Sequence, residues 1–234
     1  MRYKKVIPAE FVNRPNRFIA NVLINGEPVV VHVKNTGRCK ELLVPGCKVW
    51  LSESDNPERK TKYDLIAVEK KRTGRNPLLV NMDSQLPNSA AEEWLQYSGI
   101  FSEKAKIRRE VVYGNSRFDF QIVDNDKVSF VEVKGVTLEQ DGIAMFPDAP
   151  TERGVKHLQE LIFAEKNGYN AIVLFVIQMK EIREFRPNDM THRAFGEMLR
   201  KANRNGVKIL AYDCIVTPES MKLDSPVPVN LSEV

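Results

Sequence analysis

The segment 117–134, RFDFQIVDNDKVSFVEVK, decides the fold of the second half of this 234-residue chain. Polar and apolar residues alternate on both sides of a turn at Asp124–Asp126, which predicts two antiparallel strands whose side chains point alternately to opposite faces. Asp119 is expected on one face of the first strand, and Glu132 and Lys134 on one face of the second. The opposite faces are expected to carry the apolar residues Phe118, Phe120, Ile122, Val131 and Val133.

The hairpin brings Asp119 near Glu132 and Lys134, and this combination has a chemical meaning. Two carboxylates beside a lysine can support the hydrolysis of a phosphodiester by a divalent metal. Asp119 and Glu132 would bind Mg²⁺ or Mn²⁺ through oxygen. The metal would polarise the phosphate, and Lys134 would orient the attacking water or neutralise developing charge. A solvated amphipathic hairpin with surface ion pairs shows the same pattern, so the sequence leaves both interpretations open.

Residues 86–234 as a whole predict an α/β (α+β) domain. Further strands are expected at Lys106–Tyr113, Asn170–Gln178 and Val207–Ile215, and helices at Ala90–Tyr97, Thr151–Lys166 and Met190–Asn203. Antiparallel strands followed by a strand-helix-strand-helix-strand order predict a mixed sheet with flanking helices. Asn88 or Ser89 is expected to cap the first helix.

The helix at Thr151–Lys166 offers polar groups to the same site. Arg153, His157 and Glu160 lie along one stripe of this helix. From there His157 could reach the substrate phosphate or a water on the metal, and Arg153 with the free amides of the first turn could receive a phosphate. An ordinary capped helix with a hydrogen-bonded histidine explains the same residues.

Residues 1–85 predict a small β-barrel. The dipeptide Asn25-Gly26 is a strong signal for a two-residue hairpin turn. Strands are expected at Arg17–Ile24, Glu27–Val33, Lys48–Ser52, Lys62–Lys70 and Pro77–Asn81, with a helical turn within Cys39–Val44. Five short strands with a brief helical insertion are typical of an OB-like barrel, a fold that binds single-stranded nucleic acid or oligosaccharide.

Composition narrows the class of protein less than the motifs do. Lysine and arginine number 35 against 31 acidic residues, a net charge of +4, but they gather in clusters at 70–75, 104–109 and 200–204. Each such cluster by itself is typical of a solvated face. Three clusters in one chain modestly favour a protein that binds nucleic acid. Three cysteines without a CxxC pair indicate neither a disulfide framework nor a zinc ribbon. No apolar stretch is long enough to span a bilayer, so a cytoplasmic protein is expected.

Several motifs in order along the chain resemble the sugar fermentation stimulation protein A (SfsA) family. They are Asn35–Arg38, Glu110–Gly114, Ser116–Phe120, Val131–Lys134, Val136–Leu138, Phe146–Asp148, Thr151–Gly154 and His157-Leu158. The resemblance implies an N-terminal OB-like domain and a C-terminal restriction-endonuclease-like domain of the PD-(D/E)XK superfamily. It also implies non-specific DNA binding and a regulatory role in sugar (maltose) metabolism.

The resemblance also assigns roles to individual residues. Asp119, Glu132 and Lys134 correspond to the superfamily's core triad. A further acidic metal ligand is expected from Glu92, Glu103 or Glu110, and Glu110 is favoured because it lies in a family motif. The candidates for contacts with DNA phosphates are Arg14, Arg17, Arg38, Arg117 and Arg153. Phe18 is a candidate for base stacking, although a core position is the favoured interpretation.

Two hypotheses about function follow. In the first, the protein binds DNA mainly through phosphates and is a Mg²⁺- or Mn²⁺-dependent phosphodiesterase. In the second, it is a catalytically silent DNA-binding transcriptional regulator. An intact triad favours the first, and the lack of a recognisable helix-turn-helix weakens sequence-specific regulation. Association into a homodimer is compatible with the sequence.

Overall fold

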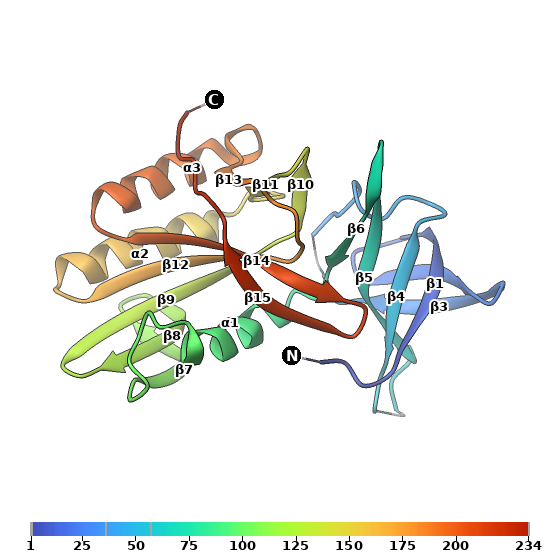
Figure 1. Ribbon diagram of the computed structural model, residues 1–234, viewed down its shortest axis with the longest axis horizontal. Coiled ribbons are helices and arrows are strands. Elements are labelled where there is room, and N and C mark those ends of the chain that lie inside the picture. The colour runs from blue at the N-terminus through green and yellow to red at the C-terminus, as the bar shows by residue number, and fades with distance from the viewer. Residues whose placement is uncertain (1, 36, 57, 234) are drawn as a thin grey trace.

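The computed structural model describes residues 2–35, 37–56 and 58–233 and shows a barrel beside a sheet with helices on both faces (Figure 1). Thr36, in the motif Asn35–Arg38, lies outside the described residues. Among those that are described, no helix is long and apolar enough to cross a membrane. Cys39, Cys47 and Cys214 are buried free thiols, as their lack of a pairing motif predicts.

The barrel is closed by five strands and extended by a sixth. The strands are β1 (Val6–Asn13), β2 (Ile19–Ile24), β3 (Glu27–Val33), β4 (Lys48–Glu53), β5 (Tyr63–Arg72) and β6 (Arg75–Asn81). Strands β3, β2, β1, β4 and β5 are neighbours in that order, and parallel pairing of β3 with β5 closes the ring. Asn25 and Gly26 both have positive φ, 53° and 86°, as the predicted hairpin turn requires.

The prediction of five barrel strands was right in number and wrong in membership. Strand β1 was not predicted, because Pro8 interrupts an alternation that is already weak in Val6–Asn13. Strand β6 was counted as a barrel strand, but it pairs with β5 alone and extends the sheet beyond the ring.

The second domain contains the predicted mixed sheet. Its strands are β7 (Lys106–Tyr113), β8 (Ser116–Asp124), β9 (Lys127–Val136), β12 (Asn170–Ile177), β14 (Lys208–Thr217) and β15 (Ser220–Pro226). Their order is β15-β14-β12-β9-β8-β7; β12 lies parallel to both β9 and β14, and the other pairings are antiparallel. A small sheet of β10 (Leu138–Gln140), β11 (Ile143–Phe146) and β13 (Glu184–Pro187) lies beside it. These three short strands and the polar β15 were not predicted.

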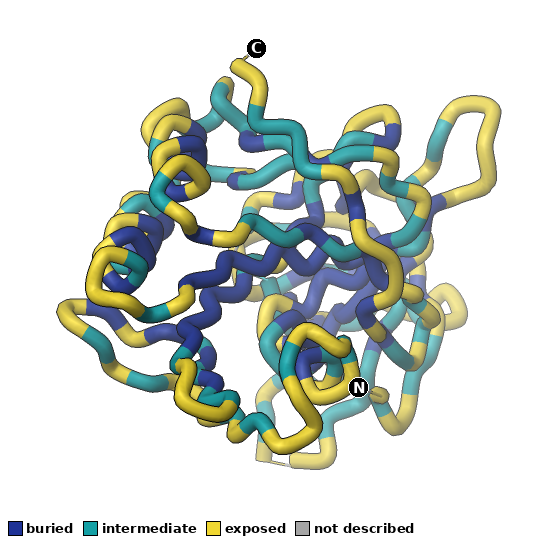
Figure 2. The backbone as a smooth tube through the Cα atoms, turned by 60° about the vertical axis from the view of Figure 1, so that its left-hand side comes forward, coloured by how far each residue is buried: buried dark blue, intermediate teal, exposed yellow. Residues whose placement is uncertain are grey.

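Helices cover both faces of this sheet. Helix α1 (Leu86–Tyr97) packs on one face, and α2 (Glu152–Lys166) and α3 (Asp189–Arg204) lie on the other (Figure 1). The central strand β12 is therefore almost wholly buried, whereas the edge strands β7 and β15, the outer helix turns and the loop tips carry exposed residues (Figure 2). Helix α2 begins after Thr151, whose hydroxyl accepts a hydrogen bond from the Gly154 amide.

Helix α1 begins earlier than predicted. Its N-cap is Gln85, which makes no side-chain capping bond, and Pro87 occupies the first turn. The expectation that Asn88 or Ser89 caps this helix is therefore wrong. Asn88 lies inside the helix, and its side chain is used for a contact within the candidate site.

The alternation along β9 places side chains as predicted, whereas that along β8 does so only in part. Val131 and Val133 pack under α1, and Glu132 faces α2. Phe120 packs with the same α1 core, but Phe118 belongs to the core under α2. The pairing of β8 with β9 ends at Phe120, so β8 diverges from β9 before that residue. Phe118 and Phe120 therefore do not share the common face that the alternation predicts.

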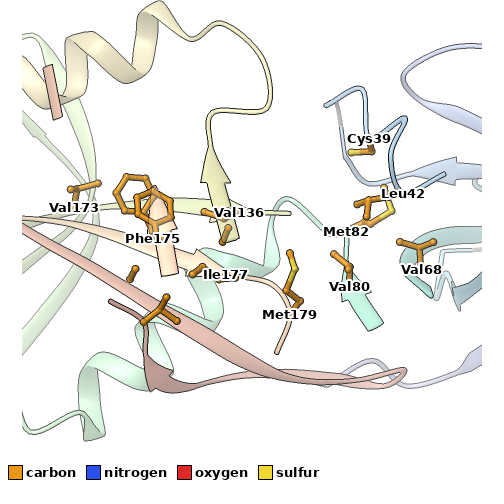
Figure 3. Close-up of a cluster of buried hydrophobic side chains, with 14 of the residues drawn as sticks. Cys39, Leu42, Val68, Val80, Met82, Val136, Val173, Phe175, Ile177 and Met179 are labelled. Carbon is orange, nitrogen blue, oxygen red and sulfur yellow. The ribbon is translucent and has the colours of Figure 1, made fainter. Parts of the chain in front are cut away.

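The core under α2 continues from the barrel into the sheet, and the core under α1 is separate from it. Figure 3 shows Leu42, Val68 and Met82 of the barrel side in line with Ile177 of the sheet, with Met179 between them. All five side chains are almost completely buried. Because close packing of this kind leaves no solvent layer between the domains, it fixes their relative position.

Two ion pairs join the domains beside this core. Lys70 of β5 donates to the carboxylate and the backbone carbonyl of Glu139 in β10, and Arg72 pairs with Glu181. The carboxylate of Glu139 also accepts from the Gly142 amide at 2.6 Å. Lys70 and Arg72 are therefore structural cations, although their cluster was considered as a nucleic-acid contact.

Loss of the Lys70 cation should destabilise the protein. Glu139 is only 4% exposed, so Lys70→Met would leave a buried charge without its partner, which costs about 3–5 kcal/mol. Urea unfolding should show this loss, whereas Lys71→Met, at the exposed neighbouring position, should change stability by less than about 0.5 kcal/mol. Equal stability of the two variants would show that the pair contributes nothing to the domain junction.

Candidate metal and phosphodiester site

The candidate site is centred on Glu132, in the middle of the mixed sheet. Its side chain lies beneath α2 and the residue is only 3% exposed. One carboxylate oxygen, Oε1, accepts hydrogen bonds from His157 Nδ1 and from Lys134 Nζ, the latter at 2.6 Å. The other oxygen, Oε2, is buried without any hydrogen-bond partner among the described residues. Burial acts to raise the pKa of Glu132, but His157 and Lys134 together lower it below its ordinary value.

His157 is a positioning residue for Glu132. It is 5% exposed, and Arg153 Nε donates to its Nε2 at 3.3 Å while its Nδ1 bonds to Glu132. These two bonds fit one neutral tautomer, in which Nδ1 carries the proton and Nε2 accepts. The predicted reach of His157 toward a phosphate or a water is not what the structure shows, since both ring nitrogens already have protein partners.

Asp119 is the second carboxylate of the site. Its Oδ2 accepts from the Val133 amide and its Oδ1 from Asn88 Nδ2, both at 2.7 Å. Burial raises the pKa of Asp119, and the nearby charge of Glu132 raises it further. Adjacent carboxylates whose pKa values move in opposite directions are typical of functional sites. Asn88 was missed as a site residue because the sequence pattern explains it as a helix cap.

The donor set fits a divalent cation. An unpartnered buried carboxylate oxygen, next to a carboxylate whose ionised form is disfavoured, is an arrangement that a cation would stabilise. The described residues contain no group of three His, Cys, Asp or Glu side chains placed to hold a metal. Asp119 and Glu132 would therefore be the side-chain ligands, and water, backbone or phosphate oxygens would complete the coordination.

The structure does not bring the expected third carboxylate into this cluster. Glu110 has a positive φ of 52° in β7, is exposed, and forms an ion pair with Arg117 at 3.6 Å. Glu92 pairs with Arg109 at 3.4 Å, and Glu103 is exposed. No contact among the described residues links these three side chains to Asp119 or Glu132, so the role of Glu110 as a metal ligand stays a prediction.

The predicted DNA-binding arginines differ in exposure and in whether their side chains already have partners within the protein. Arg14 donates to the backbone carbonyls of Arg17, Asn35, Gly37 and Arg38 and thus holds these four residues in place. Arg17 and Arg38 are exposed on the barrel. Arg117 and Arg153 are exposed on the second domain, the first beside Glu110 and the second against His157. Phe18, favoured as a core residue, is in fact 50% exposed.

The fold and this site define a two-domain protein, an OB barrel followed by a mixed sheet that carries an Asp and a Glu-X-Lys pair. Residues 12–76 match the model described as the SfsA N-terminal OB domain, and residues 85–220 match the sugar fermentation stimulation protein RE domain. The chain therefore belongs to the SfsA family, as its motifs indicate.

Relatives match over the whole chain. A sugar fermentation stimulation protein homolog of Desulfitobacterium hafniense (strain DSM 10664 / DCB-2) is 54% identical and covers 100% of both chains. One of Clostridium beijerinckii is 51% identical and covers 99% of this chain and 100% of its own. The solved structure of Pyrococcus furiosus SfsA in complex with Ca²⁺ has a TM-score of 0.85 at 27% identity and covers 98% of each chain.

The mutual effect of the two carboxylates can be tested by titration. Glu132→Gln removes a negative charge that raises the pKa of Asp119, so the pKa of Asp119 should fall in the metal-free variant. Carbon-13 NMR of the aspartate carboxyl resonances in EDTA would follow this pKa, and Glu160→Gln serves as a control. An unchanged or higher Asp119 pKa in Glu132→Gln would show that the two carboxylates do not interact.

Proposed function

We propose that this protein binds DNA through its phosphates and hydrolyses phosphodiester bonds with Mg²⁺ or Mn²⁺ at Asp119 and Glu132. The observation that carries the proposal is the unpartnered oxygen Oε2 of Glu132, buried beside a second carboxylate. The Ca²⁺ complex of the Pyrococcus furiosus relative supports it, because Ca²⁺ and Mg²⁺ both prefer carboxylate oxygen ligands.

The residues of the site would have two roles, to position the metal-binding carboxylate and to stabilise charge on the phosphate. Arg153 fixes His157, and His157 fixes the orientation of Glu132, so the carboxylate is held before any substrate arrives. A bound cation would supply positive charge against the charge that develops on the phosphate. Lys134, 2.6 Å from Glu132 Oε1, would turn toward the scissile phosphate and stabilise that charge or orient the attacking water.

A silent DNA-binding regulator is the second candidate. The lack of a third acidic side chain in the described cluster favours it, as does the ion pair that occupies Lys134. The relatives' name connects the family with sugar fermentation, and we include in the proposal that DNA binding serves regulation of sugar (maltose) metabolism. Under either candidate, binding should be dominated by phosphate contacts and should weaken steeply with salt.

Replacement of Lys134 separates the two candidates. Lys134→Ala should keep most of the affinity for DNA, since other cations contact the backbone, but should slow Mn²⁺-supported cleavage roughly a hundredfold or more. The assay compares duplex, single-stranded, flapped and junction DNA with Mg²⁺, Mn²⁺ or EDTA. Lys127→Ala, at the exposed start of the same strand, is the matched control.

The outcome is decisive in either direction. If the wild type cleaves none of these substrates above background, or cleaves no faster than Lys134→Ala, the phosphodiesterase is excluded. The binding module would then be the better account of the same fold.

A further inference from the structure

We infer that a pocket between the small sheet and the start of α3 binds a free amino acid with a large apolar side chain. The pocket lies in the second domain, where β11 and β13 meet the first turn of α3 (Figure 1). Its lining, among the residues that the structure describes, includes no residue of the barrel and none of the carboxylate site. The inference therefore goes beyond the proposed DNA binding and cleavage and does not rest on them.

Apolar side chains line much of this pocket. Ile143 and Met145 come from alternate positions of β11, and Met190 comes from the first turn of α3. The pocket has a volume of about 320 Å³, and small-molecule sites typically have about 300–1,000 Å³. Met190 is 95% exposed, so its flexible side chain is available to cover a ligand. These features favour a small molecule with an apolar body.

Two unpaired charges of opposite sign lie in the same lining. Arg183 and Asp141 are both exposed, and neither side chain forms an ion pair or hydrogen bond with any part of the chain that the structure describes. Asp141 has a positive φ of 52° in the turn between β10 and β11. Arg183 passes beside the next residue of this turn, since its amide donates to the Gly142 carbonyl at 2.9 Å. The two charges are thus held near one another without being paired.

The other charged groups of the lining already have partners within the protein. Arg186 pairs with Glu184, and Asp189 pairs with Arg200. A charge that is paired in this way is less available to a ligand, because binding would first have to break the existing contact. The two unpaired groups are therefore the charges that a ligand in this pocket would meet.

A free amino acid complements this set of groups. Its carboxylate would accept hydrogen bonds from the guanidinium of Arg183, and its ammonium group would donate to Asp141. Its side chain would lie against Ile143 and Met145. A ligand with only one of the two charges would leave the other protein charge unpaired and facing a like charge. A neutral sugar offers no charge to either group, and its hydroxyls would lose hydrogen bonds against the apolar wall.

The pocket is formed before a ligand binds. Strands β11 and β13 pair in parallel along the whole of β11, so the two strands that line the pocket are fixed to one another. Asn188, the N-cap of α3, donates from its amide to the Phe146 carbonyl at 2.8 Å and from its side chain to the Pro147 carbonyl at 3.0 Å. These bonds hold the first turn of α3 against β11. A preformed site reduces the entropy that is lost on binding.

Calorimetric titration of the full chain tests the inference, with L-phenylalanine and L-leucine as probes. At least one of them should bind, whereas glycine, which lacks an apolar side chain, and maltose, a neutral sugar, should not. Removal of either charge from the probe that binds should weaken binding by at least about tenfold, because one charge-assisted contact is lost. For phenylalanine the matched analogues are 3-phenylpropionate and 2-phenylethylamine.

Two substitutions locate the site on the protein. Arg183→Gln and Asp141→Asn each remove one exposed charge, so each should weaken binding of the amino acid by about tenfold. Asparagine adopts positive φ readily, so the turn at position 141 should keep its conformation. Arg193→Gln is the matched control, because Arg193 is an exposed arginine of α3 that does not line the pocket. It should bind the amino acid as the wild type does.

Three results would overturn the inference. The first is that neither amino acid binds, by calorimetry and by thermal shift. The second is that Arg183→Gln and Asp141→Asn bind the amino acid as tightly as the wild type. The third is that maltose, or an analogue with a single charge, binds as tightly as the amino acid. Because the titration contains neither DNA nor metal, failure of the proposed function leaves its outcome unchanged.

Discussion

The burial of Glu132 is the constraint on which the rest of the site depends. A carboxylate under a helix in the middle of a sheet is costly unless its charge is compensated. Here compensation is one-sided, because His157 and Lys134 both bond to Oε1 while Oε2 has no described partner. We propose that a divalent cation, whose chemistry fits two neighbouring carboxylates, completes this arrangement.

The surrounding fold follows from the same constraint and from the shared core. Strand β9 is central in the sheet, so Glu132 is covered by α2 and Val131 by α1. Thr151 sets the start of α2 and therefore the turn from which Arg153 and His157 reach the sheet. The apolar contact through Met179 fixes the barrel against this sheet.

The amino-acid sequence predicts what depends on local periodicity. The hairpin of β8 and β9, the common face of Glu132 and Lys134, and the helix that brings His157 toward them all follow from alternation and helical spacing. The barrel follows from turn chemistry at Asn25-Gly26 and from the number of short strands.

What the sequence does not predict depends on contacts between distant residues. The partner of Asn88 lies 31 positions away, and that of Lys70 lies 69 positions away. The separation of Phe118 from Phe120 depends on where β8 leaves β9, and the exposure of Phe18 depends on what the barrel leaves uncovered. Neither is encoded in a local pattern, since an aromatic residue in a strand is equally compatible with core and surface.

Calorimetric titration of Mn²⁺ into the metal-free wild type and into Glu132→Gln tests the central claim most directly. Glutamine keeps the shape of the side chain but removes its charge. Mutation of a residue that only supports a metal ligand typically lowers metal affinity by about tenfold to a hundredfold. We therefore predict that the affinity for Mn²⁺ falls by more than about tenfold when the ligand itself is changed. Glu160→Gln on α2 should bind Mn²⁺ as the wild type does. Equal affinity of the wild type and Glu132→Gln would contradict the claim that the buried carboxylate is a metal ligand.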